Sequence, residues 1–277
     1  MVRIGYLGPE GTFSHEALLK YTGGNLCAYS IHGYASIPDI LYEVHNGEID
    51  EAIVPIENSI EGAISVTLDM IAADVDLKIK GEEVMNIKQN LMAKKGTKIE
   101  DIKQILSHPQ PIGQCRKYIN SCFPNAEVKC VYSTAGAANE VAMLGGGLAA
   151  IGSAAAAEAY GLDILAHNIQ DGDNNSTRFI VVSKDDCGRT GHDKTSIVFS
   201  TEDRPGSLYR ILDIFNLWDI NMTRIESRPA KNQLGRYIFF VDVVGHRNDE
   251  DIKDALTMIK KKTSFFKFLG SYPYSRS

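Results

Sequence analysis

Residues 177–193 read Thr177-Arg178-Phe179-Ile180-Val181-Val182-Ser183-Lys184-Asp185-Asp186-Cys187-Gly188-Arg189-Thr190-Gly191-His192-Asp193. Residues 177–183 form a short, largely apolar run of the kind that a buried β-strand needs. Residues 184–193 are polar and glycine-containing, which is typical of a linker. We therefore predict a domain boundary here, with one domain over residues 1–185 and a second over residues 194–277.

Upstream of this boundary, strand-like and helix-like segments alternate. Short apolar runs predict strands, and apolar residues at helical spacing predict helices between them. This alternation favours an α/β fold with mainly parallel strands. Strands are predicted at residues 3–7, 26–31, 51–55, within 77–93, 104–107, 127–132, 148–151 and 177–183, and helices at 12–20, 36–46, 109–121, 134–144 and 153–160.

Downstream of the boundary, the order of the predicted strands and helices changes. A strand (195–200) and a helix (206–217) come first, and two strands (221–228 and 236–244), a helix (249–262) and a strand (265–269) follow. This βαββαβ order is that of a ferredoxin-like domain.

Charge and composition exclude several classes of protein. Residues 1–188 carry a net charge of −10 and the remainder +4, so the acidic front part argues against nucleic acid as a partner. With no long apolar run and no signal peptide at Met1, we expect no membrane association and a cytoplasmic location. The five cysteines include no C-x-x-C pair and predict neither a disulfide framework nor a zinc site. We expect no metal or organic cofactor.

Several polar segments stand where strands end and helices begin. Helix N-termini expose unpaired N–H groups and the positive end of the helix dipole, so several of them at one cleft could bind carboxylates with few full charges. Taken singly, each Ser or Thr is also an ordinary N-cap. His108 is equally a turn residue, and Glu57 a solvated or capping one. Arg178 fits a structural salt bridge as well as a ligand contact.

Together these segments resemble the prephenate dehydratase family over nearly the whole chain. The resemblance rests on Gly8-Pro9-Glu10-Gly11-Thr12-Phe13-Ser14, Pro55-Ile56-Glu57-Asn58-Ser59 with Glu61-Gly62, Ser107-His108-Pro109-Gln110 with Gln114, and Asn175-Ser176-Thr177-Arg178-Phe179. The tail resembles the ACT regulatory domain through Arg204-Pro205-Gly206-Ser207-Leu208-Tyr209-Arg210-Ile211-Leu212 and Glu226-Ser227-Arg228-Pro229. Because no chorismate mutase segment precedes Met1, the monofunctional form is expected.

The resemblance implies a catalytic domain of two α/β lobes with a cleft, similar to type II periplasmic binding proteins, followed by the ACT domain. It implies decarboxylating dehydration of prephenate to phenylpyruvate, feedback control by L-phenylalanine, and a homodimer or homotetramer. The implied catalytic residues are Thr177, Asn58, Ser107, Gln114 and Arg178, of which Arg178 is the carboxylate anchor. The implied substrate-binding residues are Glu57, Ser59, Thr12, Phe179, Ser14 and His108. The implied effector site consists of Gly206, Ser207, Leu208, Glu226, Ser227, Arg228 and Pro229.

Two other functions fit the same residues. One is an arogenate dehydratase, and the other is a non-catalytic cytosolic sensor of a small molecule, because a fold does not fix a function. For a dehydratase, Thr177 is too weak an acid to be an ordinary general acid. It would donate a hydrogen bond or relay a proton to the leaving hydroxyl, with Glu57 or His108 as the ultimate proton source.

Overall fold

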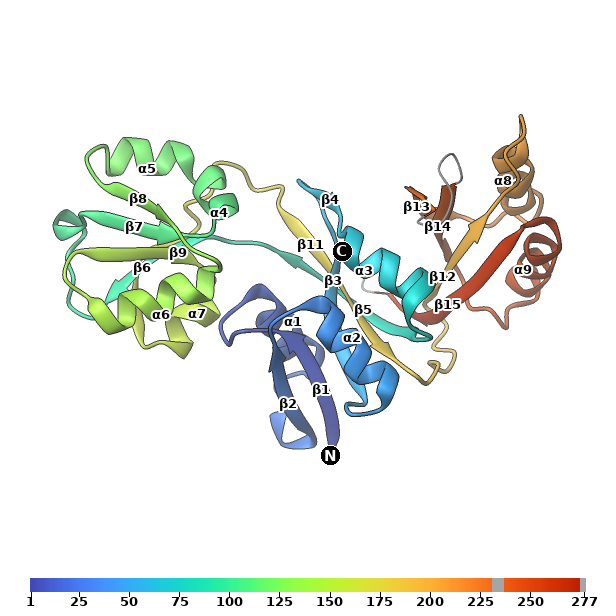
Figure 1. Cartoon of the computed structure of the whole chain (residues 1–277), viewed down its shortest axis with the longest axis horizontal. Coiled ribbons are helices and arrows are strands. Elements are labelled where there is room, and N and C mark those ends of the chain that lie inside the picture. The colour runs from blue at the N-terminus through green and yellow to red at the C-terminus, as the bar shows by residue number, and fades with distance from the viewer. Residues whose placement is uncertain (231–236, 275–277) are drawn as a thin grey trace. The chain divides into compact units, whose positions relative to one another are not determined.

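The computed structural model describes residues 1–230 and 237–274. Their strands form three sheets with helices packed on the sheet faces (Figure 1). Two of the sheets lie in the α/β region and the third in the tail, which confirms the predicted α/β class and the βαββαβ tail.

The first sheet contains strands from both ends of the α/β region. Its order is β2 (Tyr29–Tyr34), β1 (Val2–Leu7), β3 (Glu51–Asn58), β11 (Ser176–Ser183) and β5 (Lys78–Asn86), with β4 (Gly62–Ala63) beside β3. Its helical segments are α1 (Phe13–Tyr21), α2 (Ile37–Asn46) and α3 (Ser65–Asp69), and α3 continues as a wider turn over Met70–Asp74. Because β3 and β11 are neighbours, two of the predicted catalytic segments meet in this sheet.

The second sheet is mixed, which corrects the expectation of mainly parallel strands. Its order is β10 (Leu162–Ala166), β6 (Asn90–Lys94), β9 (Leu148–Gly152), β7 (Gln104–Ser107) and β8 (Glu127–Cys130). β7 is parallel to β8 and β9, whereas β6 is antiparallel to β9 and β10. Only residues 87–89 separate β5, in the first sheet, from β6, in the second.

Helices cover both faces of this second sheet. α4 (Pro109–Gln114) and α5 (Arg116–Cys122) lie on one face, and α6 (Thr134–Leu144) and α7 (Ala154–Ala159) lie on the other (Figure 1). The predicted single helix over 109–121 is interrupted at Cys115, which is not helical. Asp171 provides the reason, because its N–H donates to the Gln114 carbonyl at 2.6 Å and its carboxylate accepts from the Lys117 N–H at 3.1 Å. Both backbone groups would otherwise continue one helix.

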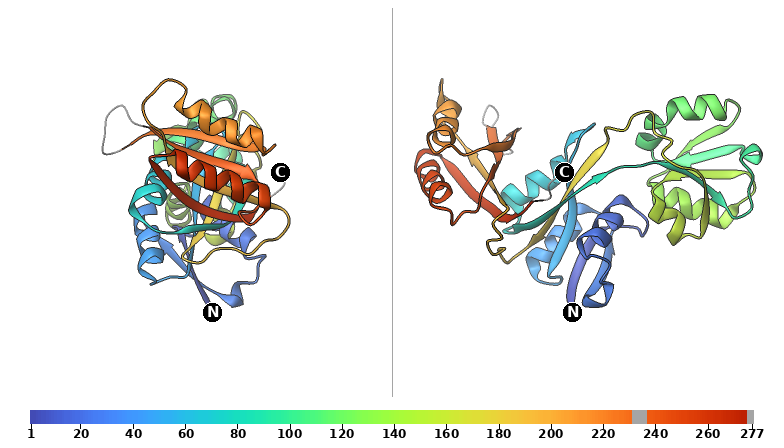
Figure 2. Two further views of the ribbon diagram at one scale, coloured as in Figure 1. Left: turned by 90° about the vertical axis from the view of Figure 1, so that its right-hand side faces the viewer. Right: turned by 180° about the vertical axis from the view of Figure 1, so that it is seen from behind.

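The tail forms an antiparallel sheet in the order β13 (Met222–Pro229), β14 (Tyr237–Val244), β12 (Asp193–Ser200) and β15 (Phe265–Pro273). α8 (Ser207–Leu217) and α9 (Glu250–Lys262) lie side by side on one face of this sheet (Figure 2, left). Their apolar faces bury Ile211, Phe215 and Ile259 against the sheet. Arg236, at the start of one predicted strand, lies outside the described residues.

The tail is fastened to residues 63–83 by charged and steric contacts. Lys194 Nζ is 2.9 Å from Glu82 Oε1. Lys267 Nζ donates to two main-chain carbonyls of residues 71 and 75, at 2.8 and 2.6 Å. Gly270 passes so close to Ile79 that a Cβ at this position would overlap the Ile79 carbonyl. Accordingly, residues 41–52, 63–83 and 180–277 form one compact unit, and residues 1–40, 53–62 and 84–179 form the other.

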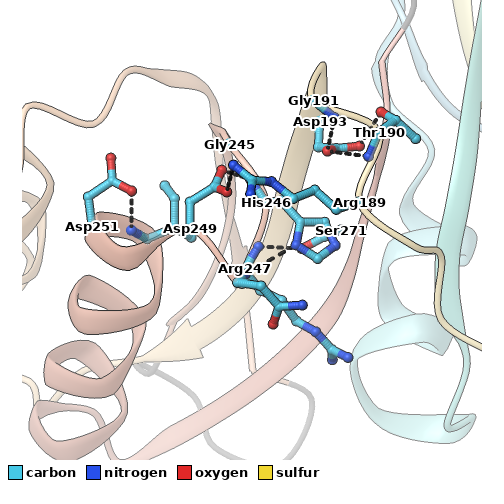
Figure 3. Close-up of polar contacts among 12 residues, drawn as sticks. Arg189, Thr190, Gly191, Asp193, Gly245, His246, Arg247, Asp249, Asp251 and Ser271 are labelled. Atoms are coloured by element: carbon cyan, nitrogen blue, oxygen red, sulfur yellow. Dashed lines mark hydrogen bonds and ion pairs between the residues drawn. The ribbon is translucent and has the colours of Figure 1, made fainter.

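The polar segment predicted as a linker is held by the turn between β14 and α9 (Figure 3). Arg189 NH2 is 2.6 Å from Asp249 Oδ1, and Arg247 NH2 is 2.6 Å from Asp186 Oδ2. The Asp193 carboxylate accepts hydrogen bonds from the backbone and hydroxyl of Thr190. Burial raises the pKa of Asp193, but these hydrogen bonds outweigh it and hold that pKa below its ordinary value.

Two features are absent from the described residues, a membrane-spanning helix and a group of possible metal ligands. In residues 1–230 and 237–274, no helix is both long enough and apolar enough to cross a membrane. Within the same residues, no three His, Cys, Asp or Glu side chains gather in a way that could hold a metal ion.

Candidate functional site

The Asn58 side chain, at the end of β3, uses its entire hydrogen-bonding capacity on protein groups. Its Oδ1 accepts from the backbone N–H groups of Ile60 and Glu61 at 2.9 and 3.0 Å. Its Nδ2 donates to Asn175 Oδ1 at 2.8 Å and to Thr177 Oγ1 at 2.9 Å. An amide offers two acceptor positions and two protons, so Asn58 is saturated. The two backbone donors also fix which end of the amide is oxygen.

The hydrogen bond from Asn58 fixes the donor and acceptor roles of the Thr177 hydroxyl. Its hydroxyl is an acceptor toward Asn58, and the residue is only 8% exposed. A hydroxyl also carries one proton to donate. Among residues 1–230 and 237–274, no side-chain or carbonyl oxygen accepts that proton from Oγ1. The arrangement therefore leaves the Thr177 O–H available to a bound molecule.

The hydrogen bonds that begin at Asn58 continue through Asn175 to Gln114, the last residue of α4. Asn175 Nδ2 donates to Gln114 Oε1 at 3.0 Å, and Gln89 Nε2 donates to the same oxygen at 3.3 Å. We call Asn58, Asn175, Gln114 and Gln89 the amide chain. Because both acceptor positions of Gln114 Oε1 are filled, its Nε2 is directed away from its neighbours in the amide chain.

Two atoms at this end of the amide chain are buried without a partner in the described part of the molecule. They are Gln114 Nε2 and Gln89 Oε1. A buried polar atom without a hydrogen bond costs about 1–3 kcal/mol, so such atoms in a native protein call for an explanation. A ligand that accepts from Gln114 Nε2 and from the Thr177 hydroxyl would provide one.

Arg178 lies on the other side of the sheet from Thr177. Successive side chains of a strand point to opposite faces. Thr177 shares a face with Asn175 and contacts Asn58, whereas Arg178 approaches Glu57, with 3.9 Å between NH1 and Oε2. The Glu57 side chain is 41% exposed, and the distance exceeds that of a tight charge-assisted hydrogen bond. The ion pair is therefore loose.

The hydroxyl groups of Ser59 and Ser107, which were also predicted for this site, are hydrogen-bonded to nearby backbone groups. Ser59 Oγ donates to the Asn174 carbonyl at 2.6 Å and accepts from the Ser176 N–H at 2.9 Å, so it joins β3 to β11. Ser107 is fully buried at the end of β7 and donates to the Ile151 carbonyl at 2.7 Å.

Residues of the two helix starts behave as caps. Thr12 caps α1, accepting from the His15 N–H at 3.3 Å and donating to the Leu7 carbonyl. His108 caps α4 through Nδ1. Ser14 is buried in α1, and Phe179 is buried in the core of β11. The structure thus brings Asn58, Thr177 and Gln114 into one network and does not bring Ser107, Thr12, Ser14 or His108 into contact with that network.

The prediction missed two members of the amide chain. The sequence contains a signal that could have identified Asn175, because this residue stands two positions before Thr177 and side chains at this spacing share a strand face. Gln89 carries no such signal, since it follows β5 in the short segment that leads to β6. The nearby Cys115 is no nucleophile, because burial first and Asp171 second raise the pKa of its thiol to about 12.

A second candidate site lies in the tail, at the start of α8. A cavity of about 250 Å³ is lined by Thr201, Glu202, Asp203, Arg204, Gly206, Ser207, Leu208, Tyr209, Tyr237 and Phe239. Gly206 precedes the helix with φ +80°, a left-handed conformation that glycine adopts without strain. The cavity therefore combines helix N–H donors, two carboxylates and aromatic rings.

Only part of the predicted effector site lines this cavity. Gly206, Ser207 and Leu208 do, whereas Glu226, Ser227, Arg228 and Pro229 lie on β13, at the edge of the sheet. The Arg228 guanidinium is bound by Asp69 at 2.7 and 3.2 Å and by Ser65 Oγ at 2.7 Å. This bidentate ion pair ties β13 to α3.

Comparison with known proteins identifies the family of this chain. The family model for prephenate dehydratase matches residues 4–187, and the model for the ACT domain matches residues 195–257. A bifunctional chorismate mutase/prephenate dehydratase of Aquifex aeolicus is 42% identical over 98% of this chain and 74% of its own length. The crystal structure of a prephenate dehydratase from Arthrobacter aurescens in complex with L-Phe is similar with a TM-score of 0.89 and 38% identity, covering 98% of this chain and 90% of that one.

A third similar structure carries a different activity. It is GqqA, a novel type of quorum quenching acylase, with a TM-score of 0.87 and 27% identity over 99% of this chain and 98% of that one. The fold alone therefore does not separate the two activities. The family model, which spans both the Asn58 and the Thr177 segments, and the identities of 42% and 38% to the two proteins above, against 27% to the acylase, decide the assignment. The chain belongs to the prephenate dehydratase family.

Proposed function

We propose that this chain is a prephenate dehydratase whose activity is regulated by L-phenylalanine. Residues 1–185 form its catalytic domain and residues 194–277 its ACT regulatory domain. The observation that carries the catalytic part is the Thr177 hydroxyl, which a saturated Asn58 holds with its proton available. The Gln114 amide protons, buried and without a partner among the described residues, support it.

The decarboxylating dehydration of prephenate needs few protein groups beyond these hydrogen-bond donors. Prephenate loses its ring carboxylate as carbon dioxide, and the electron pair of the broken C–C bond enters the ring and expels the 4-hydroxyl. Phenylpyruvate, carbon dioxide and hydroxide result, and one proton converts the hydroxide to water. A hydrogen bond from Thr177 that strengthens as the oxygen becomes negative lowers the barrier without a full proton transfer.

The substrate is a dianion, and the site meets it largely with neutral donors. Gln114 Nε2 donates to a substrate oxygen, while Asn58 and Asn175 position Thr177 and Gln114 and do not touch the substrate. Arg178 stays a predicted carboxylate anchor: from the opposite face of β11 its guanidinium would have to leave Glu57, 3.9 Å away, and reach the ligand around the start of the strand. Ser59 joins the two strands that carry Asn58 and Thr177, whereas Ser107, Thr12, Ser14, His108 and Phe179 stay predicted site residues whose side chains make no hydrogen bond to the amide chain in the described structure.

The decisive experiment measures phenylpyruvate formation from prephenate by the purified full chain, followed by its absorbance in alkali. Arogenate, assayed for phenylalanine formation, and an acyl-homoserine lactone, assayed for hydrolysis, serve as competing substrates. We expect prephenate to have the highest kcat/KM. Preference for arogenate would make the chain an arogenate dehydratase, and no turnover of either would refute the proposal in favour of a binding protein.

The effector site is the cavity at the start of α8. Its helix N–H groups suit an amino-acid carboxylate, Glu202 and Asp203 suit the ammonium group, and Leu208 and Phe239 suit an aromatic side chain. The complex of the Arthrobacter aurescens relative with L-Phe supports this choice of ligand. Glu226, Ser227 and Pro229 complete the site from β13 of a second copy, because β13 is an edge strand.

Calorimetric titration of the full chain with L-phenylalanine tests the effector, with Leu208→Asp as the variant that places a charge in the apolar part of the cavity. We expect binding by the wild type, a loss of binding in the variant and a change in prephenate turnover on binding. Equal turnover over a wide range of L-phenylalanine concentrations would contradict regulation. Light scattering of the same samples distinguishes the expected cytoplasmic homodimer or homotetramer from a monomer.

A further inference from the structure

Gln89 is a buried glutamine that no motif of the catalytic domain includes. It is 2% exposed and stands in the three-residue connection between β5 and β6. Its backbone is fixed from both sides, because its N–H donates to Gln170 Oε1 at 3.0 Å and its carbonyl accepts from the Ile169 N–H at 2.9 Å. The backbone position from which the side chain extends is therefore fixed, and in the structure the side-chain amide reaches one place.

That place is the oxygen of Gln114. Gln89 Nε2 donates to Gln114 Oε1 at 3.3 Å, beside the bond from Asn175 at 3.0 Å. With a single donor, the Gln114 amide could rotate about its last side-chain bond, since such torsions are broad. Two donors converging on Oε1 define both the rotation and the end of the amide that is nitrogen.

The direction of these bonds is set at the other end of the amide chain. The backbone N–H groups of Ile60 and Glu61 require an oxygen at Asn58 Oδ1. Each amide then presents nitrogen to the next oxygen, from Asn58 to Asn175 and from Asn175 to Gln114. Gln89 must present its nitrogen as well, because its oxygen would face another oxygen. Its own Oε1 is consequently left buried and without a partner among the described residues.

We propose that Gln89 is a positioning residue of the catalytic site: it holds the Gln114 amide so that Nε2 faces the substrate. The proposal rests on the dehydratase function proposed above. Gln89 does not touch the substrate and acts through Gln114 alone. It therefore contributes to the reaction only while Gln114 is a glutamine.

A double-mutant cycle with near-isosteric changes tests this dependence. Gln89→Met, Gln114→Met and the double variant are compared with the wild type for prephenate turnover. We expect Gln89→Met to lower kcat/KM about tenfold, the scale of one lost hydrogen bond, and to change kcat/KM less than twofold when Gln114 is already methionine. The matched control is Gln104→Met, which removes a hydrogen bond to Glu127 on the exposed surface and leaves kcat/KM within twofold.

Two further readouts keep the test independent of folding defects and of the substrate. Gln89→Glu places a carboxyl that can donate only when protonated, so its kcat/KM relative to wild type rises as the pH falls through the pKa of that carboxyl. In ¹⁵N spectra, the side-chain amide signal that Gln114→Met removes shifts in Gln89→Met and stays in place in Gln104→Met.

Normal kcat/KM in Gln89→Met, or losses that multiply in the double variant, would overturn the proposal. An unmoved Gln114 amide signal would do so without reference to turnover. A wild-type chain that does not convert prephenate would instead refute the function, and the amide signal would still decide the geometry.

Discussion

Replacing Asn58 by aspartate tests whether the polarity of the amide chain matters for the reaction. The two side chains have the same shape, and the carboxylate still accepts from the N–H groups of Ile60 and Glu61. At the position of Nδ2, however, a donor becomes an acceptor, 2.9 Å from Thr177 Oγ1 and 2.8 Å from Asn175 Oδ1. The Thr177 hydroxyl then turns its proton toward the carboxylate and away from the substrate.

The size of the effect follows from what is lost. Positioned proton chemistry contributes about 10²–10⁴-fold to a rate, which is about 2.7–5.4 kcal/mol of barrier. We therefore expect Asn58→Asp to lower kcat at least a hundredfold. Because Asn58 is saturated by protein groups and does not contact the substrate, KM should change little. The Asn175 oxygen also loses its donor while buried, which lowers the free energy of unfolding by about 1–3 kcal/mol.

Steady-state kinetics of the single variants and of Asn58→Asp combined with Thr177→Val check this account. If Asn58 acts through Thr177, the double variant is no slower than the slower single one. Thermal unfolding of each variant separates lost activity from lost structure. A kcat within threefold of wild type, or an effect confined to KM, would refute the positioning role and make Asn58 a substrate-binding residue.

Three other variants have defined outcomes. Thr177→Ala should lower kcat about a hundredfold or more with little change in KM, and near-normal turnover would remove Thr177 from the mechanism. Gly270→Ala should lower the free energy of unfolding by about 3 kcal/mol, measured by urea denaturation, because the added carbon overlaps the Ile79 carbonyl and φ is +148°. Burial raises the pKa of Glu16 above its ordinary 4.5 although the Ala155 N–H donates to it, so the stability of the protonated form is lost as the pH rises through that raised pKa. Glu16→Gln should therefore melt above wild type at pH 7 and level with it near pH 4.

The sequence predicted the elements whose signals are local. β7 and α6 begin and end where apolar runs, caps and glycine stops place them, as at Ser133 and Gly145. α3 and the turn at Met70–Asp74 were missed, and so was β10. The direction of β6 depends on which sheet it joins after a three-residue connection, and no local pattern carries that information.

The candidate site divides in the same way. Family motifs identified Asn58, Thr177 and Gln114, but the hydrogen bonds of the amide chain join residues up to 117 positions apart. Which end of an amide is nitrogen depends on such distant partners, and a linear sequence does not contain it. Arg178 is the opposite case, because strand alternation already places neighbouring residues on opposite faces. The motif grouped Thr177 and Arg178 by sequence, whereas the sheet separates them.

The fastening of the tail to residues 63–83 limits how this protein can be recombined with others. A chimera joined after Asp193 would separate Lys194 from Glu82 and would deprive Lys267 of its two carbonyl acceptors. A transplanted tail needs residues 65–82 with it, or a recipient that supplies the same carboxylates and carbonyls. The regulatory module of this chain is thus larger in space than its stretch of sequence suggests.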